Sequence, residues 1–386
     1  MSLDTMLETD EGKIISSCIQ CGMCAGSCPN GEYMKYTPRK IVYLLNNGMV
    51  DEILSSPDIL YCVSCYNCMT KCPRNIKLTE VLLPAVKEKV LESLEEVPEE
   101  LQGVFENTYQ YGNPLGESPL ERSTWKKDLD FPVKVLSEDS GPVDILWWID
   151  SYNSYHPRNI QTTVNTAKIL HKLQVNFGIL GNEESWAGEC LRLVGESGLF
   201  EEEMEKNIPI LKQYKYNKIL CNDPHAYDSL KYQYPKYGFS TEVDHITPFL
   251  AQNIEKLKPL LTNKLDYKVT YHDSCVLGRH NNYFEEPRQL LQAIDGIKLL
   301  EMEHNRRNSL CCGGGGGGMW LDSYYKMKGL DRLSDRRVKE AIAIDADIIA
   351  VSCPYETTRF EDSLKVLGND HIQVRDVIDL LYEAMR

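Results

Sequence analysis

The second half of the chain alternates short apolar runs with stretches of helical periodicity. The run at 143–149 predicts a buried strand, apolar residues at helical spacing over 161–173 predict a helix, and 175–180 predicts a second strand. The same order returns after residue 263, with strands predicted at 268–272, 297–302 and 348–352 and helices at 287–294 and 331–344. Strands that alternate with helices favour parallel sheets built from βαβ units. Two similar stretches, 143–262 and 263–386, suggest an internal duplication.

The first part of the chain has a different pattern. Residues 1–92 hold short helical stretches between two groups of cysteines. Thr37 and Pro38 are suited to begin a helix that Gly48 would end. Residues 93–142 are rich in Glu, Pro, Gly and Ser and are interpreted as an extended linker. The predicted fold class is therefore α+β and multidomain: a helical domain over 1–92, a linker over 93–142, and two duplicated α/β units with parallel sheet at 143–262 and 263–386.

Composition and charge narrow the class of protein. The 386 residues include 57 Asp plus Glu against 42 Lys plus Arg, a formal charge of −15. A chain this acidic is a poor binder of nucleic-acid phosphates and is suited to docking on a basic protein face. No apolar run approaches the ~20 residues that span a bilayer, and the start lacks the pattern of a signal peptide. We therefore expect a cytoplasmic protein that does not itself span the membrane.

Eight of the fourteen cysteines form two runs with the spacing C-x2-C-x2-C-x3-C, each followed by proline. This spacing is typical of two-cluster ferredoxins, in which three thiolates of a run hold one [4Fe–4S] cubane and the fourth reaches the other cubane. The predicted ligand sets are Cys18, Cys21, Cys24 and Cys72 for one cluster, and Cys62, Cys65, Cys68 and Cys28 for the second. Zinc sites and disulfides are the competing interpretations. The doubled spacing, with helical material between the runs, favours a helical two-cluster ferredoxin.

A second constellation of cysteines lies in the last α/β unit. Its members are Cys275, Cys311, Cys312 and Cys353, all in or beside predicted loops. Adjacent cysteines such as the pair at 311–312 are able to bind neighbouring irons. Six glycines follow that pair, at 313–318, and would let backbone amides approach the inorganic sulfides of a cluster.

Other interpretations of these residues stay open. The glycines have the composition of a flexible linker, and the four cysteines have the character of buried core residues. The glycine run also contains a G-x-G-x-x-G match by chance. The polar residues 306–310 that precede it do not suit the buried strand of a dinucleotide-binding loop, so we discount that interpretation.

These motifs resemble those of the heterodisulfide reductase family. The segment H-D-x-C-x-L-G-R-H at 272–280, C-C-G-x-G-G at 311–316 and S-C-P-Y at 352–355 are similar to the cysteine-rich CCG domain of that family. The N-terminal runs are similar to its ferredoxin-like subunit, and Gly112-Asn113-Pro114 and Trp125 resemble its linker. The resemblance covers nearly the whole chain and implies a fusion of the two subunits.

The resemblance also implies a third cluster. In that family five cysteines of the CCG motif hold a non-cubane [4Fe–4S] cluster, and the matching residues here are Cys275, Cys311, Cys312 and Cys353. The fifth position is Glu356 instead of cysteine. Four cysteines are able to hold an ordinary cubane, Glu356 is able to bind an iron through oxygen, and a solvated Glu356 without a role is the third possibility.

The first α/β unit departs further from the family pattern. Asp150, Trp186-Ala187-Gly188 and Asp223-Pro224-His225-Ala226 stand where the resemblance would place ligand cysteines. We therefore expect this unit to be free of a cluster, with Trp186 and Val194 filling the space. Cys190 and Cys221 are out of register and are expected to be structural, and His225 and His245 to be core residues or remnants beside a lost site.

The resulting hypothesis is an electron-transfer subunit of a heterodisulfide reductase-like complex. Two cubanes would relay electrons to or from a cluster at the CCG site, and the resemblance implies a flavin-containing partner protein. Two alternatives stay open: a disulfide or thiol reductase that acts at the single CCG cluster, and a docking scaffold without a third cluster.

Overall fold

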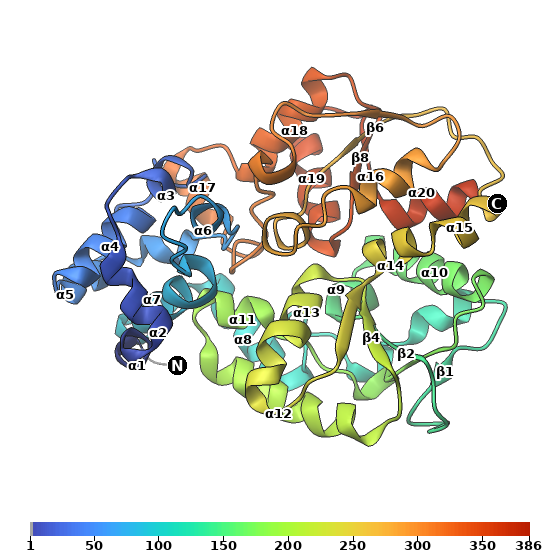
Figure 1. Cartoon of the computed structure of the whole chain (residues 1–386), viewed down its shortest axis with the longest axis horizontal. Helices are drawn as coiled ribbons and strands as arrows, with labels where there is room; N and C mark the ends of the chain where they lie inside the picture. Colours follow the sequence, from blue (N-terminus) through green and yellow to red (C-terminus); the bar gives the residue numbers. More distant parts are fainter. Residues whose placement is uncertain (1–2) are drawn as a thin grey trace.

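The computed structural model describes residues 3–386, the side chain of residue 324 excepted. Figure 1 shows a helical N-terminal region beside two α/β units that are stacked one above the other. No helix within 3–386 is long and apolar enough to cross a membrane. The mixed fold and the parallel sheets predicted from the hydrophobic pattern are confirmed.

The N-terminal region is helical, as predicted. Its helices are α1 (Leu3–Glu8), α2 (Asp10–Lys13), α3 (Met23–Gly26), α4 (Pro38–Asn46), α5 (Val50–Leu54), α6 (Asn67–Thr70) and α7 (Leu83–Ser93). Thr37 is the N-cap of α4 and Pro38 its first residue, while Gly48 follows the C-cap with a φ of +68°. Met6, Ile41 and Val86 belong to one buried core that joins α1, α4 and α7.

The segment 93–142 is not extended, so that prediction is wrong. It contains helix α8 (Glu99–Tyr111) and strand β1 (Lys134–Val135), which pairs in parallel with β3 (Phe177–Ile179). Helix α8 buries Leu101, Val104 and Thr108, which lie on one face at spacings of three and four residues. Most of its other residues are polar, including three glutamates and two glutamines, so the composition resembled that of a linker.

The first sheet has the order β1-β3-β2-β4-β5, and every pairing is parallel. Its further strands are β2 (Ile145–Trp148), β4 (Lys218–Cys221) and β5 (Glu242–His245). Trp147 of β2 packs into one core and Trp148 into another, so both faces of the sheet are covered. The helices of this unit are α9 (Ser151–Tyr155), α10 (Pro157–Lys172), α11 (Glu189–Val194), α12 (Ser197–Gln213), α13 (Pro224–Asp228), α14 (Ile246–Gln252) and α15 (Ile254–Leu257).

The second sheet has the parallel order β7-β6-β8-β9. Its strands are β6 (Lys268–Tyr271), β7 (Lys298–Leu300), β8 (Ile348–Val351) and β9 (Gln373–Asp376), and its helices are α16 (Glu286–Gln292), α17 (Ser323–Lys328), α18 (Leu333–Ala343), α19 (Pro354–Val366) and α20 (Val377–Ala384). The eight predicted strands and helices of the two units all form. Strands β4, β5 and β9 have no counterpart among the predictions.

One apolar core joins the two α/β units. Val164 of α10, Phe249 of α14 and Leu380 of α20 belong to the same buried cluster, and these helices lie between the two sheets (Figure 1). A second link reaches the N-terminal region, because α17 lies beside α3 and α6 (Figure 1), where the Tyr325 hydroxyl donates to Asn30 Oδ1 at 3.0 Å. The three parts of the chain therefore meet around the loop that carries the glycine run.

Candidate iron–sulfur sites

The eight N-terminal cysteines surround two small cavities. The first is lined by Cys18 and Cys21, which precede α3, by Cys24 within α3, and by Cys72, which follows α6. The second is lined by Cys28, Cys62, Cys65 and Cys68. Each cavity therefore takes three cysteines from one run and the last cysteine of the other run. Four thiols around one cavity are a donor set that suits a cubane.

The two sites differ in exposure. Cys21 of the first site is exposed, whereas Cys65 and Cys68 of the second are buried. Burial, followed by the nearby thiolates, raises the pKa of Cys24 to about 11, and burial raises the pKa of Cys68 well above its usual range. Because these two thiols ionise only at high pH on their own, a bound cation such as iron is needed to hold them as thiolates near neutral pH.

In each run the residue after the second cysteine has a positive φ. Gly22 precedes α3 with a φ of +83°, and Tyr66 precedes α6 with a φ of +61°. A tyrosine in this conformation is strained, and packing holds it there. The Tyr66 ring stacks on His280 with ring centroids 4.3 Å apart, and its hydroxyl donates to Asp228 Oδ2 at 3.4 Å. The second site is thus shaped by contacts from both α/β units.

The C-terminal cysteines lie at the carboxyl ends of neighbouring strands. Cys275 follows β6 and caps the helical turn Val276–His280, while Cys353 follows β8 and is the N-cap of α19. Cys311 and Cys312 stand in the loop before the glycines, and all four side chains are buried. Cys275, Cys311 and Cys312 share one apolar cluster, whereas Cys353 packs in another with Tyr355.

The glycine run is a packed turn and not a flexible linker. All six glycines are buried, and Gly313 has a φ of +81°. The Gly313 amide donates to Cys311 Sγ at 3.3 Å and the Gly314 amide to Cys312 Sγ at 3.4 Å. The amides therefore point at the cysteine sulfurs, which is an arrangement that stabilises thiolates.

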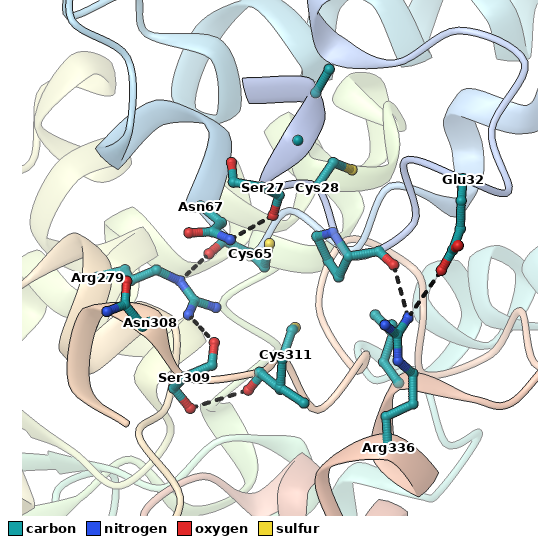
Figure 2. Close-up of a pocket in the computed structure, with 15 residues that line it drawn as sticks. Ser27, Cys28, Glu32, Cys65, Asn67, Arg279, Asn308, Ser309, Cys311 and Arg336 are labelled. Carbon is teal, nitrogen blue, oxygen red and sulfur yellow. Dashed lines mark hydrogen bonds and ion pairs between the residues drawn. The ribbon is translucent and has the colours of Figure 1, made fainter. Parts of the chain in front are cut away.

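The structure brings Cys65 of the N-terminal region to Cys311, a contact that the sequence did not predict. A hydrogen bond between these two thiols lowers the pKa of Cys65 to about 6. Both cysteines line a cavity of about 400 Å³, together with Cys28, Arg279 and Arg336. Figure 2 shows the sulfur atoms of Cys28, Cys65 and Cys311 around this space. Arg279 fixes the junction, because its Nε donates to the Cys65 carbonyl and its Nη1 to the Ser309 carbonyl, both at 2.7 Å.

Glu356 is buried against Cys312, so a solvated Glu356 is wrong. Its side chain is 1% exposed, and donor atoms of Glu356, Cys312 and His272 lie within 4.8 Å of one another. Within the described chain Glu356 Oε2 has no hydrogen-bond partner. A buried carboxylate oxygen without a partner is costly unless a cation or a donor occupies the space beside it. The group therefore fits one iron of a cluster, bound by sulfur and oxygen donors.

His272, which sequence reasoning did not single out, is oriented as a donor into this group. Arg337 Nε donates to His272 Nδ1 at 3.0 Å. Because arginine only donates, Nδ1 is the accepting nitrogen, and a neutral His272 carries its proton on Nε2. That nitrogen lies 3.4 Å from Glu356 Oε1. A metal-binding histidine normally donates from its other nitrogen, so this geometry favours His272 as a hydrogen-bond donor beside the site.

In the first α/β unit, Asp150 stands where the family resemblance would place a ligand cysteine, and hydrogen bonds hold its side chain. The Asp150 carboxylate accepts from the Ala187 amide at 3.2 Å and from Trp148 Nε1 at 3.1 Å. Trp186 and Val194 are buried, and so are Cys190 and Cys221, at 0% exposure each. These residues pack in the core and around the turn that Asp150 holds.

His225 and His245 of this unit are core residues. His245 Nε2 lies 2.8 Å from the Asn222 carbonyl, its Nδ1 accepts from the Thr247 amide, and burial lowers its pKa to about 3. His225 stacks on Tyr355 of the second unit with ring centroids 5.0 Å apart. Burial lowers the pKa of His225 as well, so both side chains are neutral.

His280 joins all three parts of the chain. Its Nδ1 lies 2.6 Å from Asp228 Oδ1 and its Nε2 lies 2.9 Å from Glu80 Oε1. Burial alone would lower the pKa of His280, but the hydrogen bonds to Asp228 and Glu80 outweigh it and raise the pKa to about 9. An imidazolium between two carboxylates therefore clamps the N-terminal region to both α/β units.

We expect this clamp to weaken at alkaline pH. A pKa raised from 6.5 to about 9 stabilises the fold fully below about pH 6.5 and loses that contribution as the pH rises through 9, a change of about 3 kcal/mol. The measurement is the midpoint of anaerobic denaturant unfolding, followed by tryptophan fluorescence at pH 6.5 and 9.5. The drop between these pH values should be larger for the wild type than for His280→Phe. Equal drops would contradict the clamp.

Comparisons with known proteins agree with this architecture. A 4Fe-4S dicluster domain profile matches residues 17–77, and a Cysteine-rich domain profile of the CCG type matches residues 269–355. The chain is 32% identical over 345 residues to the probable iron-sulfur-binding oxidoreductase FadF of Bacillus subtilis, covering 88% of this chain and 48% of that protein. It is 29% identical to the EtfAB:quinone oxidoreductase of Syntrophomonas wolfei, covering 96% of this chain and 58% of that protein.

A third relative matches over almost its full length. It is one of the subunits of the dihydromethanophenazine:CoB–CoM heterodisulfide reductase of Methanosarcina barkeri, 28% identical over 404 residues, which cover 96% of this chain and 94% of the relative. The chain spans only about half to three fifths of the other two relatives. The two profiles define the class as an iron–sulfur protein that joins a 4Fe-4S dicluster domain to a CCG-type cysteine-rich domain. Within that class the chain is a heterodisulfide reductase-like iron–sulfur subunit, as the motifs predicted.

Proposed function

We propose that this chain is the electron-transfer subunit of a heterodisulfide reductase-like complex and that it carries three iron–sulfur clusters. The observation that carries the proposal is the contact of Cys65 with Cys311, which joins the second N-terminal site to the C-terminal site around one cavity. When bound, [4Fe–4S] clusters supply one-electron transfer. The chain's own part is to hold the sites in sequence and close together.

The proposed ligand sets follow the two cavities. Cys18, Cys21, Cys24 and Cys72 would hold the first cluster and Cys28, Cys62, Cys65 and Cys68 the second. The first is the more exposed of the two N-terminal sites, because its Cys21 is exposed, and Ile19 and Met23 beside it are 63% and 50% exposed. Exposed apolar side chains around an exposed cluster site suit docking of a redox partner. We propose that a flavin-containing partner protein docks there, in a reducing, cytoplasmic setting.

The proposed third site uses the four C-terminal cysteines and Glu356. Cys275, Cys311, Cys312 and Cys353 would supply sulfur, and Glu356 Oε2, buried without a hydrogen-bond partner in the described chain, would supply oxygen where the family has a fifth cysteine.

The proposed domains are 1–92, 93–142, 143–262 and 263–386. Strand orders β3-β2-β4-β5 and β7-β6-β8-β9 support a duplication, because the first, second, third and fourth strands of each unit are arranged alike. Of the two units, 143–262 would be free of a cluster.

One observation favours a second candidate function, reduction of a small disulfide or thiol at the C-terminal site. The cavity of about 400 Å³ brings solvent space to Cys311, and Arg279 and Arg336 line it. A small anionic substrate of this class would fit such a lining. An EPR signal that appears on half-oxidation only when a thiol is present would favour this function over the relay.

Iron and sulfide analysis tests the proposal. Anaerobically purified protein is expected to contain about twelve irons and about twelve sulfides per chain, because three [4Fe–4S] clusters require them. About eight would leave a two-cluster protein, with the C-terminal unit as a docking scaffold, and would contradict the proposed third site. Proteins that copurify under anaerobic conditions then identify the partner, and a flavoprotein among them is the expected result.

A further inference from the structure

Lys87 is a lysine buried at the point where the three parts of the chain meet. It lies in the middle of α7 and is 0% exposed. Its Nζ donates to three backbone carbonyls: Cys62 at 2.5 Å, Leu193 at 2.9 Å and Gly316 at 3.1 Å. An ammonium group has three N–H donors, and each finds an acceptor here. Burial lowers the pKa of Lys87, but a neutral amine would turn a lone pair toward one of these oxygens, so the geometry favours the charged form.

The backbone around Lys87 is packed closely enough to exclude side chains. A Cβ on Gly316 would lie 2.8 Å from the Cys62 carbonyl oxygen, and one on Gly315 would lie 2.8 Å from the Val63 carbonyl oxygen. A Cβ on Gly195, at the end of α11, would lie 2.6 Å from the carbonyl carbon of Lys87. The glycine run is therefore pressed directly against the loop that carries Cys62 and Cys65. Close approach to this loop explains the glycines better than flexibility does.

The charge of Lys87 has no carboxylate to balance it. Within residues 3–386 no acidic side chain lies at salt-bridge distance from its Nζ, although the neighbouring Lys89 of α7 pairs with Glu92. Burial of an unpaired charge is costly, and carbonyl dipoles offset only part of the cost. The second site lies beside Lys87, and its Cys62 would carry negative charge once bound to iron. A fixed cation beside such a site favours its reduced, more negative state.

We propose that Lys87 is a positioning residue of the electron-transfer junction, which holds the glycine run on the Cys62–Cys65 loop and raises the reduction potential of the second N-terminal site. The inference rests on the proposed function, since it requires a cluster at Cys28, Cys62, Cys65 and Cys68. Lys87 would thereby favour residence of the electron at the site that contacts Cys311. The first site is lined by different residues, so this charge would affect its reduction potential much less.

The test is a redox titration of the anaerobic holoprotein followed by EPR, with Lys87→Met as the variant and Lys89→Met as the matched control. Both changes remove one positive charge from α7, but the Lys89 side chain is 42% exposed. We expect Lys87→Met to shift the midpoint potential of the second site to a more negative value and to leave the first site unchanged. Lys89→Met is expected to shift neither. The first site thus serves as an internal reference.

The outcomes separate this proposal from the function on which it rests. If the second site holds no cluster in the wild type, the proposed function fails. If the cluster is present and Lys87→Met shifts its potential no more than Lys89→Met does, the role of Lys87 is overturned, even where the variant is less stable. Lys87→Gln, which removes the charge but keeps N–H donors, gives the same readout should the methionine variant not fold.

Discussion

Cys311→Ala is expected to remove about four of about twelve irons per chain and to leave the signals of the two N-terminal clusters in place. Cys311 is buried between Cys275, Cys312 and Cys65, and hydrogen bonding in which its S–H donates to these sulfurs raises its pKa well above the usual range. Loss of its sulfur would remove the central donor of the C-terminal site. The second N-terminal site keeps all four of its own cysteines, so its cluster should survive. Iron analysis and EPR of the reduced protein measure both effects.

Cys190→Ala is the matched control for this experiment. Cys190 is a buried cysteine in the first α/β unit, and its Sγ contacts His225 Nδ1 at 3.9 Å and the Tyr355 hydroxyl at 3.7 Å. Burial raises its pKa, as expected of a structural thiol. Removing its sulfur should leave the iron content at about twelve. If Cys311→Ala also keeps all of its iron, then the adjacent pair does not bind iron and the third site must be abandoned.

The cysteine spacing predicted which cysteines line each N-terminal cavity, because three cysteines that are separated by two residues each lie on one loop. The hydrophobic pattern likewise predicted β2, β6 and β8, which are short, apolar and buried on both faces. It did not predict α8, whose buried residues are only Leu101, Val104 and Thr108 in a polar stretch. A helix with only a narrow apolar stripe is easily mistaken for a linker, because most of its residues are polar.

The junction between the sites could not be predicted in the same way. Lys87 and Gly316 are 229 residues apart in sequence, and Arg279 is 214 residues from Cys65. Contacts at such separations depend on how whole units dock, and no local pattern encodes them. From the sequence alone, a buried lysine of an amphipathic helix cannot be distinguished from an exposed one. The glycine run gave the one available signal, since six glycines in a buried turn indicate close approach of another backbone.

Glu356 and Asp150 both stand where the family resemblance would place a ligand cysteine, but their surroundings differ. Asp150 directs one carboxylate oxygen to the Ala187 amide and to Trp148 and the other to the Ser151 amide, so the protein satisfies both. Glu356 leaves Oε2 without a partner within the described residues, beside Cys312. A protein that had simply lost the site would be expected to satisfy or expose that oxygen. The difference supports the proposal that the second unit holds a cluster and that the first is free of one.

Glu356→Gln is therefore expected to make the iron of the C-terminal site labile. The glutamine keeps the size of the side chain and a hydrogen bond to His272, but it loses the negative charge that would bind iron. Removal of residues that merely support a metal ligand typically costs 10–100-fold in affinity, so loss of the ligand itself should speed the removal of about four irons by a chelator at least about tenfold. The measurement is the anaerobic rate of iron transfer to the chelator, read against the unchanged EPR signals of the N-terminal clusters.

Two further variants give this prediction its control and its converse. Glu361→Gln makes the same change of charge on the same helix, α19, at a residue that pairs with Arg158 on the surface, and should leave the rate as in the wild type. Glu356→Cys supplies a thiolate where the family has one, and should slow iron loss and change the EPR signal of the third cluster, because sulfur replaces oxygen at one iron. Equal rates for Glu356→Gln and the wild type would show that Cys275, Cys311, Cys312 and Cys353 hold the cluster alone. Glu356 would then be a buried acid that His272 stabilises by hydrogen bonding.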